Sequence, residues 1–196
     1  GKHVIPVPTM ELKPHFKGYL IDSLKQQGAQ IHLWGVGTSL ITSRDCPAFG
    51  GVYKLAAIYD KERARFIPKI KISENTEKVT NPGNKKIYRI YHKETNKIIA
   101  DLICLEDEII DENKELVLFD PNETWKKTLL IPASYRLREL LVPVFKQGKC
   151  VYTSPEVMDI QAYCREELDT LWEESKRLAY PHRIHVDLSQ KLWNMR

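Results

Sequence analysis

The chain has 196 residues, of which 42% are hydrophobic and 29% are charged, a balance typical of a globular protein with its own core. Thirty basic residues against 26 acidic ones give a net charge of +4, and the two signs are interspersed, which argues against a dedicated nucleic-acid-binding protein. No apolar run approaches the roughly 18–20 residues that a membrane span needs, and no signal peptide is visible, so we expect a cytoplasmic protein with no membrane partner. The four cysteines lie far apart and form no C-x-x-C pair, which favours reduced thiols over disulfides or structural zinc.

The beginning of the chain has the pattern of an α/β unit. Residues 4–9 are apolar and contain prolines, which favours a short strand or an extended entry. Apolar positions at helical spacing predict a helix from about Phe16 to Gln27, and Gly28 is a residue type that commonly ends a helix. The short apolar run from Ile31 to Trp34 predicts a buried strand, which leads directly into a glycine loop at residues 35–38. Helix, turn, buried strand and glycine loop in this order predict an α/β fold with one unit of a parallel sheet or barrel.

The rest of the chain, from about residue 67 to 196, is predicted to be mostly β, with one long helix. We expect strands at residues 52–59, 66–72, 87–91, 98–105 and 116–119, further strands between 129 and 145, and a short strand at 184–186. The strands before and after residues 93–96 should form a β-hairpin. Residues 188–195 read as a final helical turn or two.

The long helix is predicted over residues 155–178. Thr153 and Glu156 have the spacing of a capping box, and Pro155 suits the first turn. An apolar stripe at helical spacing is expected to pack into the core, and its members are Val157, Ile160, Cys164, Leu168, Leu171 and Trp172.

The strongest candidate for a binding site is the glycine loop, Gly35, Val36, Gly37 and Thr38. Glycines let the backbone approach a ligand closely, successive N–H groups can form an anion-binding nest, and the Thr38 hydroxyl adds a donor. Loops beyond the carboxyl ends of strands are also where ligands bind in α/β sheets and barrels. A tight turn that crowds a neighbouring strand explains the same residues without a ligand, so both interpretations stay open on spacing alone.

No other residues form a recognisable catalytic arrangement. The sequence has no Ser/His/Asp pattern, no P-loop and no dinucleotide fingerprint. His182 and His185 flank an arginine, but nothing supplies the further ligands that zinc would need, so no metal site is assigned. The basic stretch at residues 69–97 interleaves lysines with tyrosines, which fits either a nucleic-acid surface or, better, a solvated sheet face diluted by glutamates.

Four stretches in order resemble the nicotinate phosphoribosyltransferase family. The first is IHLWGVGTSLITSRDCPAFGGVYKL at Ile31–Leu55, with a G-[VI]-G-T loop followed by a segment ending V-[YF]-K-L. The second is PKIKISENTEKVTNPG at Pro68–Gly83, with an E-K-x-T-x-P-G turn. The third and fourth are RELLVPVFKQGKCVY at Arg138–Tyr152 and HVDLSQKLW at His185–Trp193. Together they cover most of the chain.

The resemblance implies the terminal part of an irregular phosphoribosyltransferase α/β barrel at residues 1–66 and a β-rich C-terminal domain at residues 67–196. It places Gly35, Gly37 and Thr38 on the phosphate of phosphoribosyl pyrophosphate or of the product mononucleotide. The family joins nicotinic acid to phosphoribosyl pyrophosphate in NAD synthesis, couples ATP hydrolysis through a phosphorylated histidine, uses Mg²⁺ on the pyrophosphate, and commonly forms homodimers. That histidine and the nicotinate pocket belong to the upstream half of the family's chain, so we assign no catalytic residue here.

The resemblance also leads to expectations about the chain as a whole. We expect the C-terminal part of a longer enzyme, inactive alone, with apolar surface exposed around Ile31–Leu33. Where the family has an acidic loop before the first helix, this chain has Lys13–Gly18. Either the acidic segment is lost or altered, or this member builds that edge of the site differently. Two alternatives stay open: a related enzyme acting on nicotinamide, and a non-enzymatic basic module that binds nucleic acid through residues 69–97.

Overall fold

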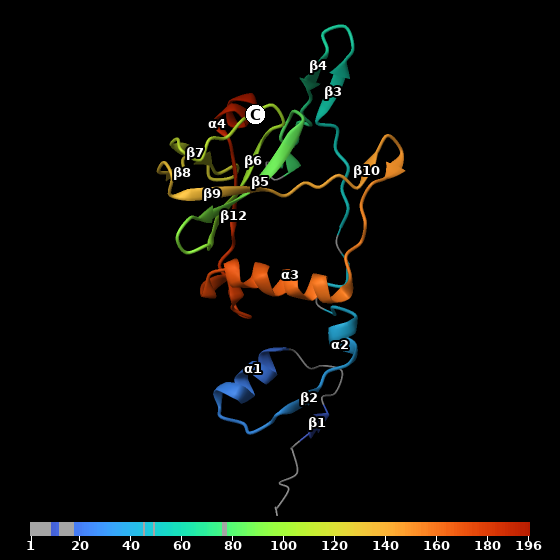
Figure 1. Cartoon of the computed structure of the whole chain (residues 1–196), viewed down its shortest axis with the longest axis vertical. Helices are drawn as coiled ribbons and strands as arrows, with labels where there is room; N and C mark the ends of the chain where they lie inside the picture. The colour runs from blue at the N-terminus through green and yellow to red at the C-terminus, as the bar shows by residue number, and fades with distance from the viewer. Residues whose placement is uncertain (1–8, 12–17, 45, 49, 76–77) are drawn as a thin grey trace, which may run out of the picture. The chain divides into compact units, whose positions relative to one another are not determined.

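The computed structural model describes residues 9–11, 18–44, 46–48, 50–75 and 78–196, and Figure 1 shows their course. The chain divides into two compact units, one of residues 1–52 with 178–180 and one of residues 53–177 with 181–196. We call them the loop unit and the sheet unit. The expected strand at residues 4–8 and the altered segment at 13–17 lie outside the described residues, and the domain boundary at residue 66 stays a prediction.

The described residues of the loop unit form two short parallel strands and two helices, β1 Thr9–Glu11, α1 Gly18–Gln26, β2 Leu33–Gly35 and α2 Thr38–Ile41. The predicted first helix and its terminating glycine are confirmed. Gly28 has φ +80°, its N–H donates to the Lys25 carbonyl, and the Ala29 N–H donates to the Leu24 carbonyl, both at 3.0 Å. This pair of bonds is the glycine-dependent ending that helices commonly use, because a side chain disfavours positive φ.

The predicted buried strand at Ile31–Trp34 is wrong in its burial. Strand β2 starts at Leu33, whose side chain is 59% exposed, and no described residue from 18 to 52 is buried. An apolar run becomes buried only where a second layer packs on it, and among the described residues β2 pairs with β1 alone. The exposed apolar surface expected around Leu33 is therefore present.

The sheet unit is built on one six-stranded sheet. Its strands are β5 Lys85–His92, β6 Ile98–Leu105, β7 Leu116–Phe119, β8 Lys127–Leu130, β9 Tyr135–Glu139 and β12 His185–Leu188, in the spatial order β8-β7-β12-β6-β5-β9. The expected hairpin around residues 93–96 is confirmed as β5 and β6, with Asn96 in the left-handed region at φ +57°. Strand β12 lies parallel to β6 and antiparallel to β7.

Two small hairpins complete the strands of this unit. They are β3 Ala57–Asp60 with β4 Arg65–Pro68, and β10 Phe145–Lys146 with β11 Lys149–Cys150. The strands expected at residues 52–59 and 66–72 are thus present but shorter than predicted.

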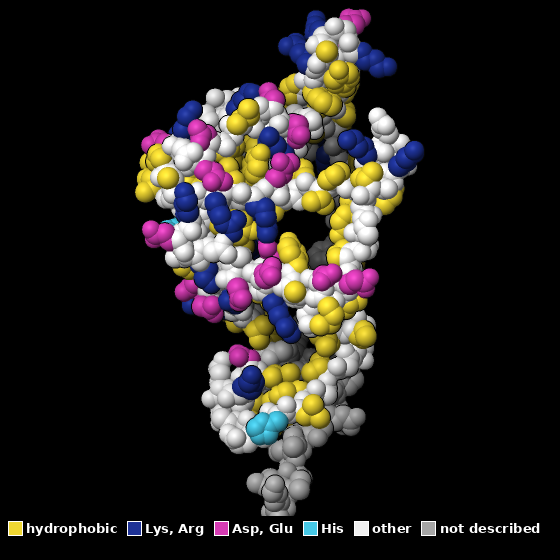
Figure 2. Space-filling model, viewed as in Figure 1, with side chains coloured by type: hydrophobic (Ala, Val, Ile, Leu, Met, Phe, Trp, Pro, Cys, Tyr) yellow, Lys and Arg dark blue, Asp and Glu magenta, His cyan; other side chains and the backbone are white. Residues whose placement is uncertain are grey.

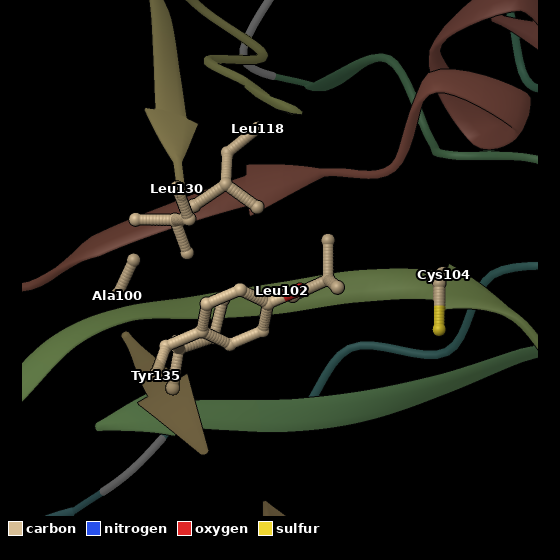
Figure 3. Close-up of a cluster of buried hydrophobic side chains, with 7 residues drawn as sticks. Ala100, Leu102, Cys104, Leu118, Leu130 and Tyr135 are labelled. Carbon is tan, nitrogen blue, oxygen red and sulfur yellow. The ribbon is translucent and has the colours of Figure 1, made fainter. Parts of the chain in front are cut away.

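The six-stranded sheet is curled. Strands β8 and β9 lie at its opposite edges, yet residues 131–134 alone connect them, and four extended residues reach at most about 14 Å. The sheet must therefore bend until its edges approach each other. Inside the bend lies a buried cluster, drawn in Figure 3, of Ile90, Ala100, Leu102, Cys104, Leu118, Leu130 and Tyr135.

A second buried cluster lies under the last helix, α4 Gln190–Met195. Phe119 of β7 stacks on Trp193 with ring centroids 5.6 Å apart, and Leu192 is fully buried. Ser189 caps the helix: its hydroxyl oxygen accepts from the Leu192 N–H at 3.2 Å and its O–H donates to Glu108 at 2.7 Å. The final helical turns expected from the sequence are confirmed.

The predicted helix over residues 155–178 is wrong in length. Helix α3 spans Val157–Thr170, Leu171 is extended at φ −75° and ψ 144°, and a short 3-10 helix η2 follows at Glu173–Lys176. The Lys97 ammonium donates to the Asp169 and Leu171 carbonyls at 2.8 Å each, and the Trp172 indole donates to the Ile98 carbonyl at 2.7 Å. The two Lys97 bonds occupy backbone oxygens that a continuing helix would use itself, and the Trp172 bond fixes the following residue to β6, so the helix ends there.

The expected cap and burial of this helix are also wrong. Glu156 is the N-cap residue and has no side-chain capping bond, so Thr153 and Glu156 form no capping box. The predicted core stripe is largely exposed, with the Val157 side chain 76% exposed, because the sheet contacts α3 through polar residues instead. None of the described helices is long and apolar enough to span a membrane.

Candidate functional site

The glycine loop lies at the carboxyl end of β2, one of two parallel strands. Gly35 is the last residue of the strand, Val36 and Gly37 follow it, and Thr38 begins α2. Gly35, Gly37 and Thr38 are exposed to solvent, while Val36 is half-buried. The structure therefore brings the four predicted residues together on one accessible turn, in the strand-to-helix position where anions bind in α/β folds.

The carbonyl groups of Gly37 and Thr38 accept hydrogen bonds from residues of the same turn. The Gly37 carbonyl accepts from the Leu40 N–H at 3.0 Å and the Ile41 N–H at 3.2 Å. The Thr38 carbonyl accepts the hydroxyl and the N–H of Thr42 at 2.6 and 3.0 Å. The N–H groups of Gly37 and Thr38 precede the first of these bonds along the chain, so they can donate to an external acceptor.

The glycine at position 37 is not explained by crowding. A Cβ atom built there meets no described atom within 4 Å, but the backbone at φ −108° and ψ −111° lies outside the regions that residues with a side chain usually occupy. The interpretation as a tight turn pressed against a neighbouring strand therefore has no support among the described residues. The unusual backbone conformation explains the glycine, and the open side of the turn leaves room for a ligand beside the backbone.

The described residues offer no metal centre. They contain no group of three or more His, Cys, Asp or Glu side chains placed to hold an ion. The His182 N–H donates to the Glu174 carbonyl, and His185 lies exposed at the start of β12. Mg²⁺ usually binds through one or two carboxylates together with substrate phosphates, and no step through Mg²⁺ or ATP is assigned to the described residues.

The basic stretch at residues 69–97 is partly engaged within the protein. The Lys85 ammonium donates to the Asn81 and Gly83 carbonyls at 2.7 and 2.6 Å, and partial burial lowers its pKa. Arg89 is paired with Asp101 at 2.8 Å, and Lys97 binds the end of α3. Figure 2 shows acidic and basic side chains alternating over the visible face of the sheet unit, which is not the continuous positive surface that nucleic acid favours.

One polar cluster was missed from the sequence: Tyr91 with the arginines of β5 and β9, against Glu167 of α3. The guanidinium of Arg138 binds the Glu167 carboxylate through two bonds of 2.5 and 2.7 Å, and Arg89 lies 3.6 Å from the same carboxylate. The bond from Arg138 is the main cause that lowers the Glu167 pKa. The sequence signal for this cluster was the i, i+2 spacing of Arg136 with Arg138 and of Arg89 with Tyr91, which places each pair on one face of its strand. That spacing does not reveal which helix covers the polar face.

Comparisons with known proteins agree on one group. A family model described as "Nicotinate phosphoribosyltransferase C-terminal domain" matches residues 84–196. The nicotinate phosphoribosyltransferase of Bacillus subtilis is 43% identical over 176 residues, which cover 90% of this chain and 35% of that protein. The human nicotinate phosphoribosyltransferase is 30% identical over 169 residues, covering 86% of this chain and 30% of the relative.

A solved structure is similar as well. The crystal structure of human nicotinic acid phosphoribosyltransferase matches with a TM-score of 0.65 and 21% identity over 95% of this chain and 32% of that one. At this identity the match supports the mixed α/β fold with its curled sheet. The chain spans about a third of the length of the curated relatives that it matches.

Proposed function

The chain belongs to the nicotinate phosphoribosyltransferase family, and we propose that it is the C-terminal part of an enzyme that joins nicotinic acid to phosphoribosyl pyrophosphate. The products are nicotinate mononucleotide and pyrophosphate, in NAD biosynthesis. The proposal is supported by the family match over residues 84–196 and by relatives that carry this name in bacteria and in animals. Because the chain spans 35% of the Bacillus relative, the activity is proposed for the longer polypeptide, with this chain inactive alone.

Within that enzyme, Gly35, Val36, Gly37 and Thr38 bind the phosphate on the ribose of the substrate or product. The observation that carries this assignment is the open turn at Gly37, where the exposed residues Gly37 and Thr38 follow a parallel strand. A phosphate oxygen accepts several such bonds at once, and fixed donors need no reorganisation when the ligand arrives. The loop thus holds and orients the phosphoribosyl group, while bond breaking at the ribose occurs elsewhere.

The remaining assignments follow the family resemblance. Residues 1–66 form the end of an irregular α/β barrel, and residues 67–196 form a β-rich C-terminal domain whose role is packing rather than chemistry. The parallel pairing of β1 with β2 supports the first assignment, since barrels of this kind have parallel strands. We propose a homodimer for the complete enzyme, with ATP, Mg²⁺ and the nicotinate ring bound by residues outside this chain.

The test is product formation by the longest natural polypeptide that contains this chain. The reaction contains phosphoribosyl pyrophosphate, ATP and Mg²⁺, with nicotinic acid or nicotinamide supplied separately. We expect nicotinate mononucleotide from the acid and no product from the amide. Product from the amide alone moves the protein to the related activity, and no product from either in a folded protein contradicts the proposal.

A further inference from the structure

We propose that the sheet unit holds a second ligand site, separate from the glycine loop, that binds a small oxyanion such as a phosphate group. The site is a cavity of about 370 Å³ bounded by β5, β9 and the C-terminal half of α3. Tyr91 and Arg136 are the groups that would contact the ligand, and Arg138 lies beside them. All of these elements belong to the sheet unit, so the site does not depend on the loop unit.

The strand register brings the polar groups to one face of the sheet. Tyr91 of β5 is the direct partner of Arg136 on β9, and Arg89 is the direct partner of Arg138. Cross-strand partners project from the same face, and residues two apart on a strand do so as well. These four side chains therefore share one face, while Ile90, Leu137 and Tyr135 project from the other into the curled core.

The hydroxyl of Tyr91 is the clearest sign of a ligand. Tyr91 is fully buried and lines the cavity, and its hydroxyl has no hydrogen-bond partner among the described residues. Burial raises the Tyr91 pKa, so the group remains a neutral O–H donor at physiological pH. A buried hydroxyl without a partner is costly and unusual in native proteins, and an acceptor placed in the cavity would satisfy it.

Arg136 supplies the charge that such an acceptor requires. Its guanidinium carbon lies 4.0 Å from the centroid of the Tyr91 ring, and one of its nitrogens donates to the Asn96 side-chain oxygen. A guanidinium has five N–H donors, so most of those on Arg136 are available to a ligand. Arg138, by contrast, is committed to the Glu167 carboxylate through both terminal nitrogens.

Among the described half-buried arginines of the cluster, Arg136 is the one that forms no ion pair, which favours an anion beside it. The half-buried groups of the cluster are three guanidinium groups against two carboxylates, and they are Arg89, Arg136, Arg138, Asp101 and Glu167. Glu166 and Asp169 also line the cavity, but both are exposed, so solvent screens them more strongly. An oxyanion between Arg136 and the Tyr91 hydroxyl completes the balance and gains a charge-assisted bond from each.

The experiment follows arginine side chains by NMR in the full 196-residue chain. Inorganic phosphate is added at constant ionic strength against sodium chloride, and the Nε–Hε signals of Arg63, Arg136 and Arg138 are recorded. We expect a saturable shift of the Arg136 signal. Tyr91→Phe should weaken phosphate binding about tenfold or more, because it removes a bond to a charged group. Since that buried hydroxyl has no partner, Tyr91→Phe should fold and be at least as stable as the parent in the absence of phosphate.

Two further variants locate the effect. Arg63→Gln changes an exposed arginine of the same unit, which is paired with Asp60, and should leave the Arg136 shift unchanged. Thr38→Ala alters the glycine loop and should also leave it unchanged, so failure of this site and failure of the loop assignment are distinguishable. A linear shift shared equally by Arg63 and Arg136, or a Tyr91→Phe protein that binds phosphate as tightly as the parent, overturns the proposal.

Discussion

The two units differ in what holds them together. The sheet unit has two buried clusters, formed by strands that come from residues 85 to 188, whereas no described residue from 18 to 52 is buried. The proposed phosphate loop lies between residues 18 and 52, where no described residue is buried. The buried clusters of the sheet unit stabilise the fold. The contrast teaches that stability and binding of the phosphoribosyl group are separable in this chain. Substitutions in the buried clusters should change unfolding, and substitutions in the glycine loop should change binding of that group.

The largest effect is expected from truncating the core. Leu102 is fully buried in β6, so Leu102→Ala should lower the free energy of unfolding by about 3 kcal/mol through lost transfer energy and a cavity. Leu33→Ala, at an exposed position of β2, should change it by less than about 0.5 kcal/mol. Urea unfolding followed by circular dichroism measures both. Equal losses of unfolding free energy in the two variants would show that the loop unit has a core of its own, and would contradict the difference described between the two units.

The second effect contrasts two glycines. Gly83 has φ +89°, and a Cβ atom there would lie 2.7 Å from the Leu105 side chain. Gly83→Ala should therefore cost about 2 kcal/mol, from left-handed backbone and a displaced core side chain. Gly51→Ala, where a Cβ meets no described atom within 4 Å, should be close to neutral. Thermal unfolding of the two variants compares them, and a neutral Gly83→Ala contradicts the packing described around Leu105.

The sequence predicted local features well. The β5–β6 hairpin and the glycine-terminated helix α1 each depend on residues within a few positions of one another, such as Asn96 in the turn and Gly28 at the helix end. The glycine loop was found for the same reason, since its four residues are contiguous. Its role as a phosphate site came from the family resemblance, and it stays a prediction.

The features that the sequence did not predict depend on distant residues. Strand β12 pairs with β6, so residue 185 lies opposite residue 100, and no periodicity contains that information. Helix α3 ends where Lys97, far away in sequence, binds its last carbonyls. Its apolar stripe correctly indicated a helix but did not say that the sheet would contact the helix through Glu167. The Tyr91–Arg136 cavity was missed for the same reason, because three separate elements form it.

The third prediction concerns the loop itself, in the longest natural polypeptide. Thr38→Val keeps the side-chain shape and removes the hydroxyl, so the KM for phosphoribosyl pyrophosphate should rise about tenfold, from the loss of one bond to a charged group. The unfolding midpoint should not change, because Thr38 is exposed. Steady-state kinetics with nicotinic acid measure the first quantity, with Thr42→Val as the matched control on the same turn. An unchanged KM removes Thr38 from the phosphate site.

The smallest effect tests how α3 is attached to the sheet. The arginines hold the folded-state pKa of Glu167 below its ordinary value near 4.5, so its contribution to stability is complete above that value and is lost as pH falls through the folded pKa. Glu167→Gln should therefore lower the free energy of unfolding by about 1–2 kcal/mol at neutral pH. At acidic pH below 4.5 the difference from the parent should shrink, since the parent carboxylate is protonated as pH falls through its lowered pKa.

Glu173→Gln is the matched control for this last prediction. Glu173 also has a lowered pKa, through a bond from Lys176, but it is exposed and its partner lies on the same short helix. It should change unfolding too little to measure at either pH, because exposed pairs are screened by solvent and fix no tertiary contact. If Glu167→Gln behaves like Glu173→Gln, the arginine contacts are not what attaches α3, and the cavity beside Tyr91 loses one of its walls.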